Sequence, residues 1–160
     1  MSRRKKTIKR RDIGVDPVYQ NRLVMRFTNC LIRDGKKSIA QKVMYDALAR
    51  VKEKTSEDPV HVFEMALQNV GPRLEVRPRR VGGASYQVPQ EVRGERKVAL
   101  AMRWIIGSAE KLPNKEFHTF AEKLASEFVA AAKGEGEAIR KRDVVHKMAE
   151  ANRAFAHFRW

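Results

Sequence analysis

The sequence predicts a mainly α-helical fold, a bundle of about six helices with one two-stranded β-hairpin between helices three and four. Apolar residues recur at intervals of three and four over most of the chain, and the interval changes to two only around residues 73–89. A length of 160 residues with 42% hydrophobic content suffices for one domain with a modest core. We therefore expect a single domain over 1–160, with a basic N-terminal tail (1–16), a hairpin arm (73–89) and a C-terminal helix and tail (137–160).

Three helical segments precede the hairpin, and residues that break helices separate them. The first has apolar residues at i, i+4, i+7 and i+8 within residues 23–31 and stops before Asp34-Gly35. A second apolar stripe of this kind covers residues 39–51. The third begins at Asp58-Pro59, an N-cap followed by proline at the first helical position, and ends at Gly71-Pro72.

Three further helices follow the hairpin. Their apolar stripes lie within residues 98–105, 117–128 and 145–149. We expect the first of these helices to end at Gly107 and the second near Gly134. The connections are short and no internal repeat is present, which favours one bundle over separate domains.

Alternation of apolar and charged residues predicts the hairpin. Arg73 to Arg77 and Tyr86 to Val88 have a period of two, and Gly82-Gly83 between them is able to adopt positive φ. Pro78 and Pro89 cannot donate to a central ladder. The pattern therefore indicates a ribbon with free edges, which must be supported by the helices or by a ligand because an isolated ribbon is marginal in water.

Positive charge is concentrated in a few segments. The net charge is +15, and residues 1–11 contain seven basic residues and no acid. Residues 73–97 contain seven basic residues against three acids, and residues 133–160 contain seven against four. Such zones favour contact with polyanions such as nucleic acid or an anionic membrane surface. No apolar run approaches the roughly 18 residues of a membrane span, and no apolar segment follows the basic N-terminus, so we expect a soluble, unexported chain.

The hairpin has the chemistry of a nucleic-acid-binding arm. Arg77, Arg79 and Arg80 present guanidinium groups that match phosphate oxygens, and Gly82-Gly83 permits close approach of the backbone. Tyr86 offers a ring for stacking on an unpaired base. The alternative is a solvated hairpin that arginine keeps soluble.

Two other classes of protein share some of these features. An enzyme, most naturally a ribonuclease, would need acid–base groups, but no metal, nucleophile or paired-carboxylate motif organises His61, Glu64, His118, His146 and His157. We predict no catalysis, no cofactor and no metal, and the lone Cys30 supplies neither a disulfide nor a metal cage. A dimeric architectural DNA-binding protein with basic β-ribbon arms is the second alternative, which preference for structured RNA over duplex DNA would exclude.

Aromatic and histidine residues outside the hairpin have more ordinary interpretations. Trp104 lies at helical spacing beside Met102 and Ile105 and is predicted to be a core residue. His118 is predicted to be a partly buried packing residue. For the terminal Trp160, packing and stacking on RNA are both open.

Several long motifs resemble one family. They are, in order, R-D-G-K-K (33–37), residues 69–72, E-V-R (75–77), R-R-V-G-G-A-S-Y-Q-V-P (79–89), A-L-A-M-R-W (99–104) and M-A-E-A-N-R-A-F-A-H-F-R-W (148–160). Through these motifs the chain resembles, over its whole length, the small-subunit ribosomal protein seven family, of bacterial or organellar type.

This resemblance implies a helical domain with a protruding ribbon arm, bound to the 3′ major domain of small-subunit ribosomal RNA and initiating assembly of the head. It also implies that the arm and the C-terminal helix line the tRNA exit site. The expected partners are this RNA, exit-site tRNA and neighbouring head and platform proteins, and no membrane. The expected location is the small ribosomal subunit, in the cytoplasm or in an organellar stroma or matrix.

The resemblance assigns basic residues to two groups. The expected ribosomal RNA contacts are Arg3, Arg4, Lys5, Lys6, Lys9, Arg10, Arg11, Lys36, Lys37, Arg73, Arg77, Arg79, Arg80, Arg96 and Lys97. The expected tRNA-proximal residues are Val81, Gly82, Gly83, Ala84, Ser85, Tyr86, Lys141, Arg142, Lys147 and Arg153.

We predict that deletion of residues 1–11 weakens binding to a ribosomal RNA fragment and leaves Tm nearly unchanged, because the segment carries seven positive charges and little apolar surface. For the full chain we expect log affinity to fall with log salt at a slope of about −5 or steeper, taking about −0.7 per phosphate contact. Anisotropy titrations over a salt series should show a shallower slope for the truncated chain. Unfolding of the domain on truncation would contradict the prediction.

Overall fold

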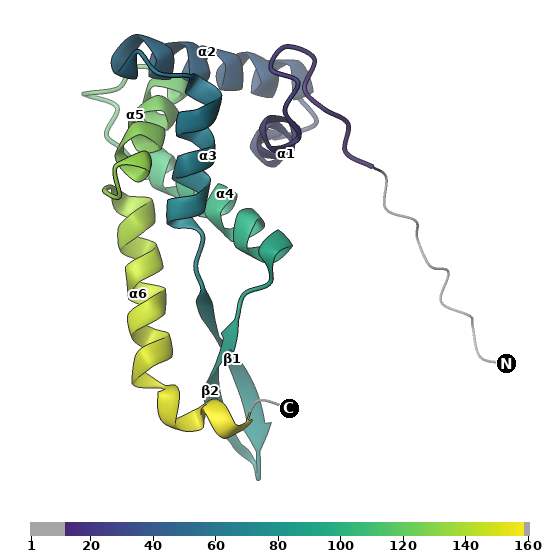
Figure 1. The fold of residues 1–160 in the computed structure, drawn as a ribbon, viewed down its shortest axis with the longest axis vertical. Helices are drawn as coiled ribbons and strands as arrows, with labels where there is room; N and C mark the ends of the chain where they lie inside the picture. Colours follow the sequence, from purple (N-terminus) through teal and green to yellow (C-terminus); the bar gives the residue numbers. More distant parts are fainter. Residues whose placement is uncertain (1–11, 159–160) are drawn as a thin grey trace, which may run out of the picture.

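The computed structural model describes residues 12–158, and the predicted contacts Arg3 to Arg11, as well as Trp160, lie outside that range. Within it the fold is a helical bundle from which a two-stranded antiparallel ribbon extends (Figure 1), which confirms the predicted fold class. The helices are α1 (Arg22–Leu31), α2 (Lys37–Thr55), α3 (Pro59–Val70), α4 (Gly94–Lys111), α5 (Phe120–Ala132), α6 (Glu137–Ala151) and the 3₁₀ helix η1 (Arg153–Phe158). The strands are β1 (Leu74–Val81) and β2 (Ala84–Glu91). Across residues 12–158, every helix is too short or too polar to span a bilayer.

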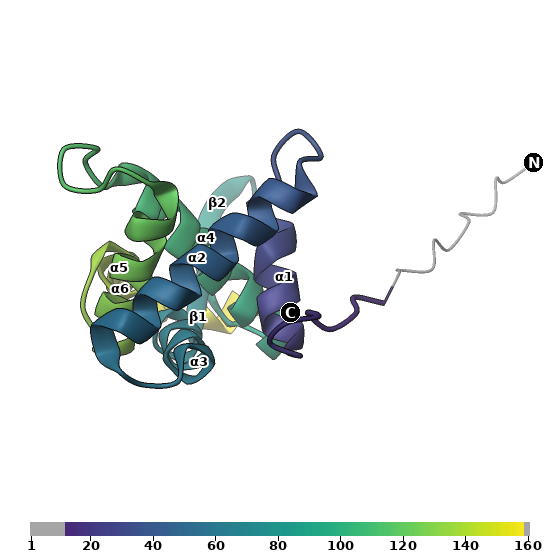
Figure 2. The same ribbon diagram turned by 90° about the horizontal axis from the view of Figure 1, so that it is seen from above.

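Three phenylalanines form the centre of the core. Phe27 of α1, Phe63 of α3 and Phe128 of α5 have no exposed surface, and their rings meet edge to face with centroids 5.3–5.4 Å apart. Helix α5 packs against α2, α3 and α4. Helix α2 crosses the end of the bundle that faces away from the ribbon, as the view from above shows (Figure 2). Trp104 is 9% exposed and belongs to this core, as predicted.

Local signals set some helix ends and fail at others. Helix α3 starts as predicted, with Pro59 at its first position and the Asp58 carboxylate accepting the Val60 N–H at 3.1 Å. Helix α4 does not end at Gly107, since it continues to Lys111. Glycine inside a helix costs about 1 kcal/mol relative to alanine. The helix continues nonetheless, and Ser108 and Ala109 of its last turns are buried.

The start of α5 also corrects a prediction. Thr119 is its N-cap and forms a capping box with Glu122, so the helix begins at Phe120. Phe117 and His118 therefore lie in the preceding loop, and His118 is exposed instead of partly buried. Ile39 and Met148, placed in apolar stripes by their spacing, are 57% and 46% exposed.

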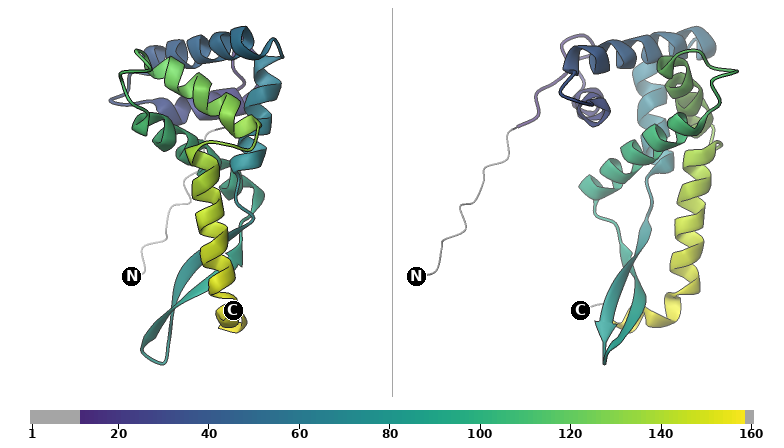
Figure 3. Two further views of the ribbon diagram at one scale, coloured as in Figure 1. Left: turned by 90° about the vertical axis from the view of Figure 1, so that its left-hand side faces the viewer. Right: turned by 180° about the vertical axis from the view of Figure 1, so that it is seen from behind.

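The ribbon has the predicted two-residue turn. Val81 pairs with Ala84, and Gly82 and Gly83 between them have φ of 57° and 88°, the signs that a type I′ turn requires. The strands extend to Glu91, two residues beyond the predicted arm. Helix α6 runs beside the ribbon and η1 turns back toward it (Figure 3), and contacts join both helices to the strands. The expected support by helices is confirmed.

We predict that Phe128→Ala lowers the free energy of unfolding by about 3–5 kcal/mol, because it removes the ring that touches both other phenylalanines and leaves a cavity. Urea denaturation measures the change. Met65→Ala on the outer face of α3, where the side chain is 38% exposed, is the control and should cost less than about 1 kcal/mol. Equal losses for the two variants would contradict the assigned core.

Candidate nucleic-acid interface

Basic residues predicted to contact RNA lie in two places, on the ribbon and its root and, away from the ribbon, at the start of α2. Arg79 and Arg80 of β1 are exposed, and no carboxylate within residues 12–158 is at ion-pair distance from either. Lys36 and Lys37 are exposed where α2 begins. These four cations are therefore accessible to phosphate groups.

A buried carboxylate holds other arginines at the root of the arm. Glu75 of β1 is 7% exposed and accepts hydrogen bonds from Arg77 Nε at 2.7 Å and from Arg96 Nε at 2.8 and 2.9 Å. Burial raises the pKa of Glu75, but the hydrogen bonds from Arg96 and Arg77 outweigh it and hold that pKa below its ordinary value. Arg77 and Arg96 are therefore partly neutralised, unlike Arg79 and Arg80.

A histidine of α6 fixes the chain as it enters the ribbon. The backbone N–H of Arg73 donates to His146 Nε2 at 3.0 Å. Burial and then the neighbouring Arg142 lower the pKa of His146, which favours the neutral ring that accepts this bond. His146, one of the acid–base groups in the sequence, thus has a structural role as the acceptor of the Arg73 backbone hydrogen bond.

The tertiary structure brings residues of both predicted groups together. A cavity of about 360 Å³ between the end of α3, the start of β1, the first turn of α4 and α6 is lined by Gln68, Asn69, Gly71, Arg73, Lys97, Arg142 and His146. Arg142, expected on the tRNA side, donates to the Asn69 carbonyl at 2.7 Å and to Asp143. It therefore lies with Arg73 and Lys97 of the ribosomal RNA group.

Tyr86 differs from the expectation of an open stacking surface. Its ring packs on Phe155 and Phe158 of η1, with centroids 5.1 and 5.2 Å away, and it pairs across the ribbon with Arg79. The pairing places Tyr86 behind the tip, where its apolar ring is covered by the C-terminal aromatic residues. The exposed tip consists of Gly82, Gly83, Ala84 and Ser85, with Val81 partly buried.

The remaining predicted tRNA-proximal residues lie on α6 and η1. Lys141 is exposed and its ammonium lies 5.7 Å from the centre of the Trp104 ring. Lys147 and Arg153 are exposed as well. Because η1 contacts β2, Arg153 lies on the same side of the molecule as the ribbon.

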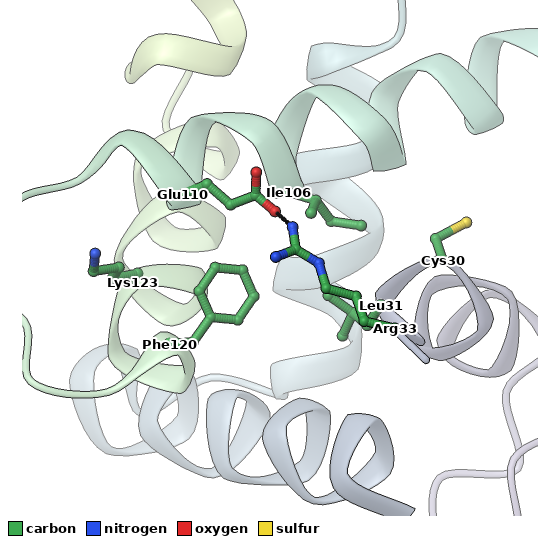
Figure 4. A pocket seen from close by; sticks show the side chains of 7 residues that line it. All are labelled: Cys30, Leu31, Arg33, Ile106, Glu110, Phe120 and Lys123. Atoms are coloured by element: carbon green, nitrogen blue, oxygen red, sulfur yellow. Dashed lines mark hydrogen bonds and ion pairs between the residues drawn. The ribbon is translucent and has the colours of Figure 1, made fainter. Parts of the chain in front are cut away.

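Another cavity, of about 440 Å³, lies between the end of α1, the last turns of α4 and the first turn of α5 (Figure 4). An ion pair between Arg33 and Glu110 spans it, and the Cys30 sulfur points away from that pair. Lys123 donates to the Leu112 carbonyl and to Asn114 Oδ1. The charged groups that line this cavity therefore stabilise connections between helices. Residues 12–158 contain no cluster of side chains suited to a metal ion.

Comparison with known proteins identifies the family. A model described as ribosomal protein S7p/S5e matches residues 2–153. The chain belongs to this family. It is 54% identical over 157 residues to small ribosomal subunit protein uS7 of Myxococcus xanthus, covering 98% of this chain and 99% of the relative. It is 51% identical over 160 residues to the protein of the same name from Magnetococcus marinus, covering all of both chains.

Membership of the S7p/S5e family decides the class of function. The chain is a structural component of the small ribosomal subunit, where it associates with ribosomal RNA and ribosomal proteins, and it is not an enzyme. The subunit lies in the cytoplasm or in the matrix of an organelle. The DNA-binding alternative is thereby set aside.

Sequence reasoning did not identify the residues that hold the arm of this family member. The sequence marked Glu75 as part of an alternating strand and of the E-V-R motif, and His146 as a possible acid–base group, but indicated no partner in the fold for either. An acid between two arginines of a basic ribbon is a weak signal for an ion pair. Nothing in the local sequence marks the contact of Tyr86 with Phe155 and Phe158.

We predict that the pKa of Glu75, measured by carboxyl NMR, lies below its ordinary value and rises in Arg96→Gln. A carboxylate whose pKa is lower in the folded than in the unfolded state stabilises the fold above the unfolded pKa, and this contribution is lost as the pH falls through the folded pKa. The stability difference between wild type and Glu75→Gln should therefore shrink on acidification below about pH 4.5.

The free energy of unfolding is measured by urea titration at each pH. Glu53→Gln, at an exposed position of α2, removes one negative charge away from the arm and is the control. A difference between wild type and Glu75→Gln that stays constant down to pH 3 would contradict the ion-pair network.

Proposed function

We propose that this S7p/S5e family member binds the 3′ major domain of small-subunit ribosomal RNA, initiates assembly of the head, and lines the tRNA exit site with its arm and C-terminal helix. The observation that carries the proposal is a ribbon that is fixed at its root and extends away from the helical bundle (Figure 1). Its Arg79 and Arg80 are exposed, whereas residues 12–72 and 98–132 of the bundle are nearly neutral. Contacts to phosphate groups fix the position of a protein on a nucleic acid, and exposed arginines on a supported ribbon suit such contacts.

The arm is suited to two tasks along its length. Arg79 and Arg80 are exposed cations near its middle and outer part, which supports contact with phosphates. The tip around Gly82-Gly83 carries no charge and presents backbone groups at a tight turn. We assign the arginines to ribosomal RNA and the tip to the exit-site tRNA.

Among the proposed phosphate contacts, we expect Arg77 and Arg96 to contribute less to RNA affinity than Arg79 and Arg80. Both are held by Glu75, and approach of a phosphate requires them to share their donors. Charge-assisted hydrogen bonds already formed in the protein reduce the gain from a new anion. The affinity should therefore depend most on the arginines farther along the ribbon.

The tRNA-side proposal includes η1 because it is attached to the arm. Tyr86 packs on Phe155 and Phe158, so Arg153 at the start of η1 keeps a defined position relative to the ribbon. A surface built from two segments in this way can bind one ligand without ordering either segment first. Lys147 on the exposed side of α6 extends the same basic surface.

We predict that Arg79→Gln with Arg80→Gln flattens the salt dependence of RNA affinity by about 0.7 for each lost phosphate contact, and that Arg77→Gln alone has a smaller effect. The double variant should also enter reconstituted small subunits poorly. Anisotropy titrations and sedimentation of reconstituted particles give the two measurements. An effect of Arg77→Gln as large as that of the double variant would contradict the ranking.

A shortened arm tests the role of the tip. The turn already has the minimum of two residues, so shortening requires removal of Arg80, Val81, Ala84 and Ser85, after which Gly82-Gly83 joins Arg79 to Tyr86. We expect this variant to enter subunits as well as the matched control Arg80→Gln does, but to retain less exit-site tRNA than that control. Tip removal that blocks incorporation far beyond the control would refute the two-part assignment.

A further inference from the structure

We propose that the cavity lined by Arg73, Lys97, Arg142 and His146 is a binding pocket for a single phosphate group, and that RNA fills it with one phosphodiester. The inference rests on the proposed RNA-binding function and adds a defined site to it. Four segments far apart in the sequence build the pocket: the end of α3, the residues before β1, the first turn of α4 and the middle of α6.

The pocket has the size and charge of an anion site. Its volume of about 360 Å³ is ample for a phosphate with bound water, and its lining contains three cations and no carboxylate. An arginine and a lysine that face a common cavity repel each other unless an anion lies between them. The lining thus favours occupation by a negative group.

One cation of the lining is held in position by the fold. Arg142 donates to the Asn69 carbonyl at 2.7 Å and to Asp143 outside the lining, which neutralises part of its charge. At Arg73 only the backbone N–H is fixed, by its bond to His146, and within residues 12–158 the Arg73 guanidinium has no carboxylate partner. The Arg142 guanidinium is therefore oriented before a ligand arrives, which lowers the entropic cost of binding, and Arg73 and Lys97 supply most of the available charge.

Lys97 gives the pocket a positive charge that no acid of residues 12–158 neutralises. Its stem lies so close to Gly71 that a Cβ at that position would be 2.7 Å from both Cγ and Cε. Within residues 12–158, its ammonium group makes neither a hydrogen bond to a side chain nor an ion pair. Gly71 thus allows the Lys97 stem to lie along the wall of the pocket.

Lys97→Met tests the pocket, because methionine keeps an unbranched stem against Gly71 and removes the charge. Lys111→Met at the other end of α4 is the matched control, with the same charge change at an exposed site. We expect Lys97→Met to lower affinity for the ribosomal RNA fragment about tenfold and to flatten the salt slope by about 0.7, with a much smaller effect in the control.

Gly71→Ala separates the geometry of the pocket from net charge. The backbone φ of −63° accepts alanine, and all charges stay, but the Lys97 stem must move. Inorganic phosphate, added to the full-length protein and followed through the His146 ring signals, should shift those signals in wild type at lower concentrations than in Gly71→Ala or Lys97→Met. Circular dichroism confirms that each variant is folded.

The outcomes are distinguishable. RNA affinity of Lys97→Met equal to that of Lys111→Met overturns the phosphodiester assignment while the proposed function stands. In that case, phosphate-dependent shifts at His146 would identify the pocket as a site for the free anion only. Failure of wild type to prefer the ribosomal RNA fragment over unrelated RNA overturns the proposed function and this inference together.

Discussion

The buried carboxylate of Glu75 is the contact on which the placement of the arm depends. A two-stranded ribbon has too little buried surface to persist alone in water. Glu75 joins the first strand to the first turn of α4 through Arg96, and it does so with a group that is expensive to bury unless it is paired. The direction in which the ribbon leaves the bundle is therefore constrained at its root by an ion pair between two residues that are 21 positions apart in the sequence.

Two further contacts hold the ribbon at other points along its length. The Arg73 backbone bonds to His146 on the bundle side of Glu75, and Tyr86 packs on η1 near the far end. Each partner lies in the C-terminal quarter of the chain, so α6 and η1 support the ribbon along much of its length (Figure 3). Loss of the C-terminal aromatic residues would remove a contact of the arm even though the arm itself is unchanged.

Basic residues of this S7p/S5e family member have two different relations to the fold. Arg77, Arg96 and Arg142 hold carboxylates or carbonyls of the protein, whereas Arg79, Arg80 and Lys97 have no such carboxylate partner within residues 12–158. The number of cations in a segment therefore overstates the charge available to RNA. Net charge describes attraction at long range, and the hydrogen-bond partners decide which cations bind at short range.

The sequence by itself determined the helical class, the start of α3 at Asp58-Pro59 and the turn at Gly82-Gly83. These features depend on backbone geometry and on spacing over a few residues, which a sequence displays directly. The long family motifs also sufficed to identify the family. Only the tertiary structure decided that α4 passes through Gly107, that His118 is exposed, and that Tyr86 is covered by η1. It also placed Arg73, Lys97 and Arg142 around one cavity. Those outcomes depend on packing and ion pairs between residues far apart in the chain, whose energies no local pattern records.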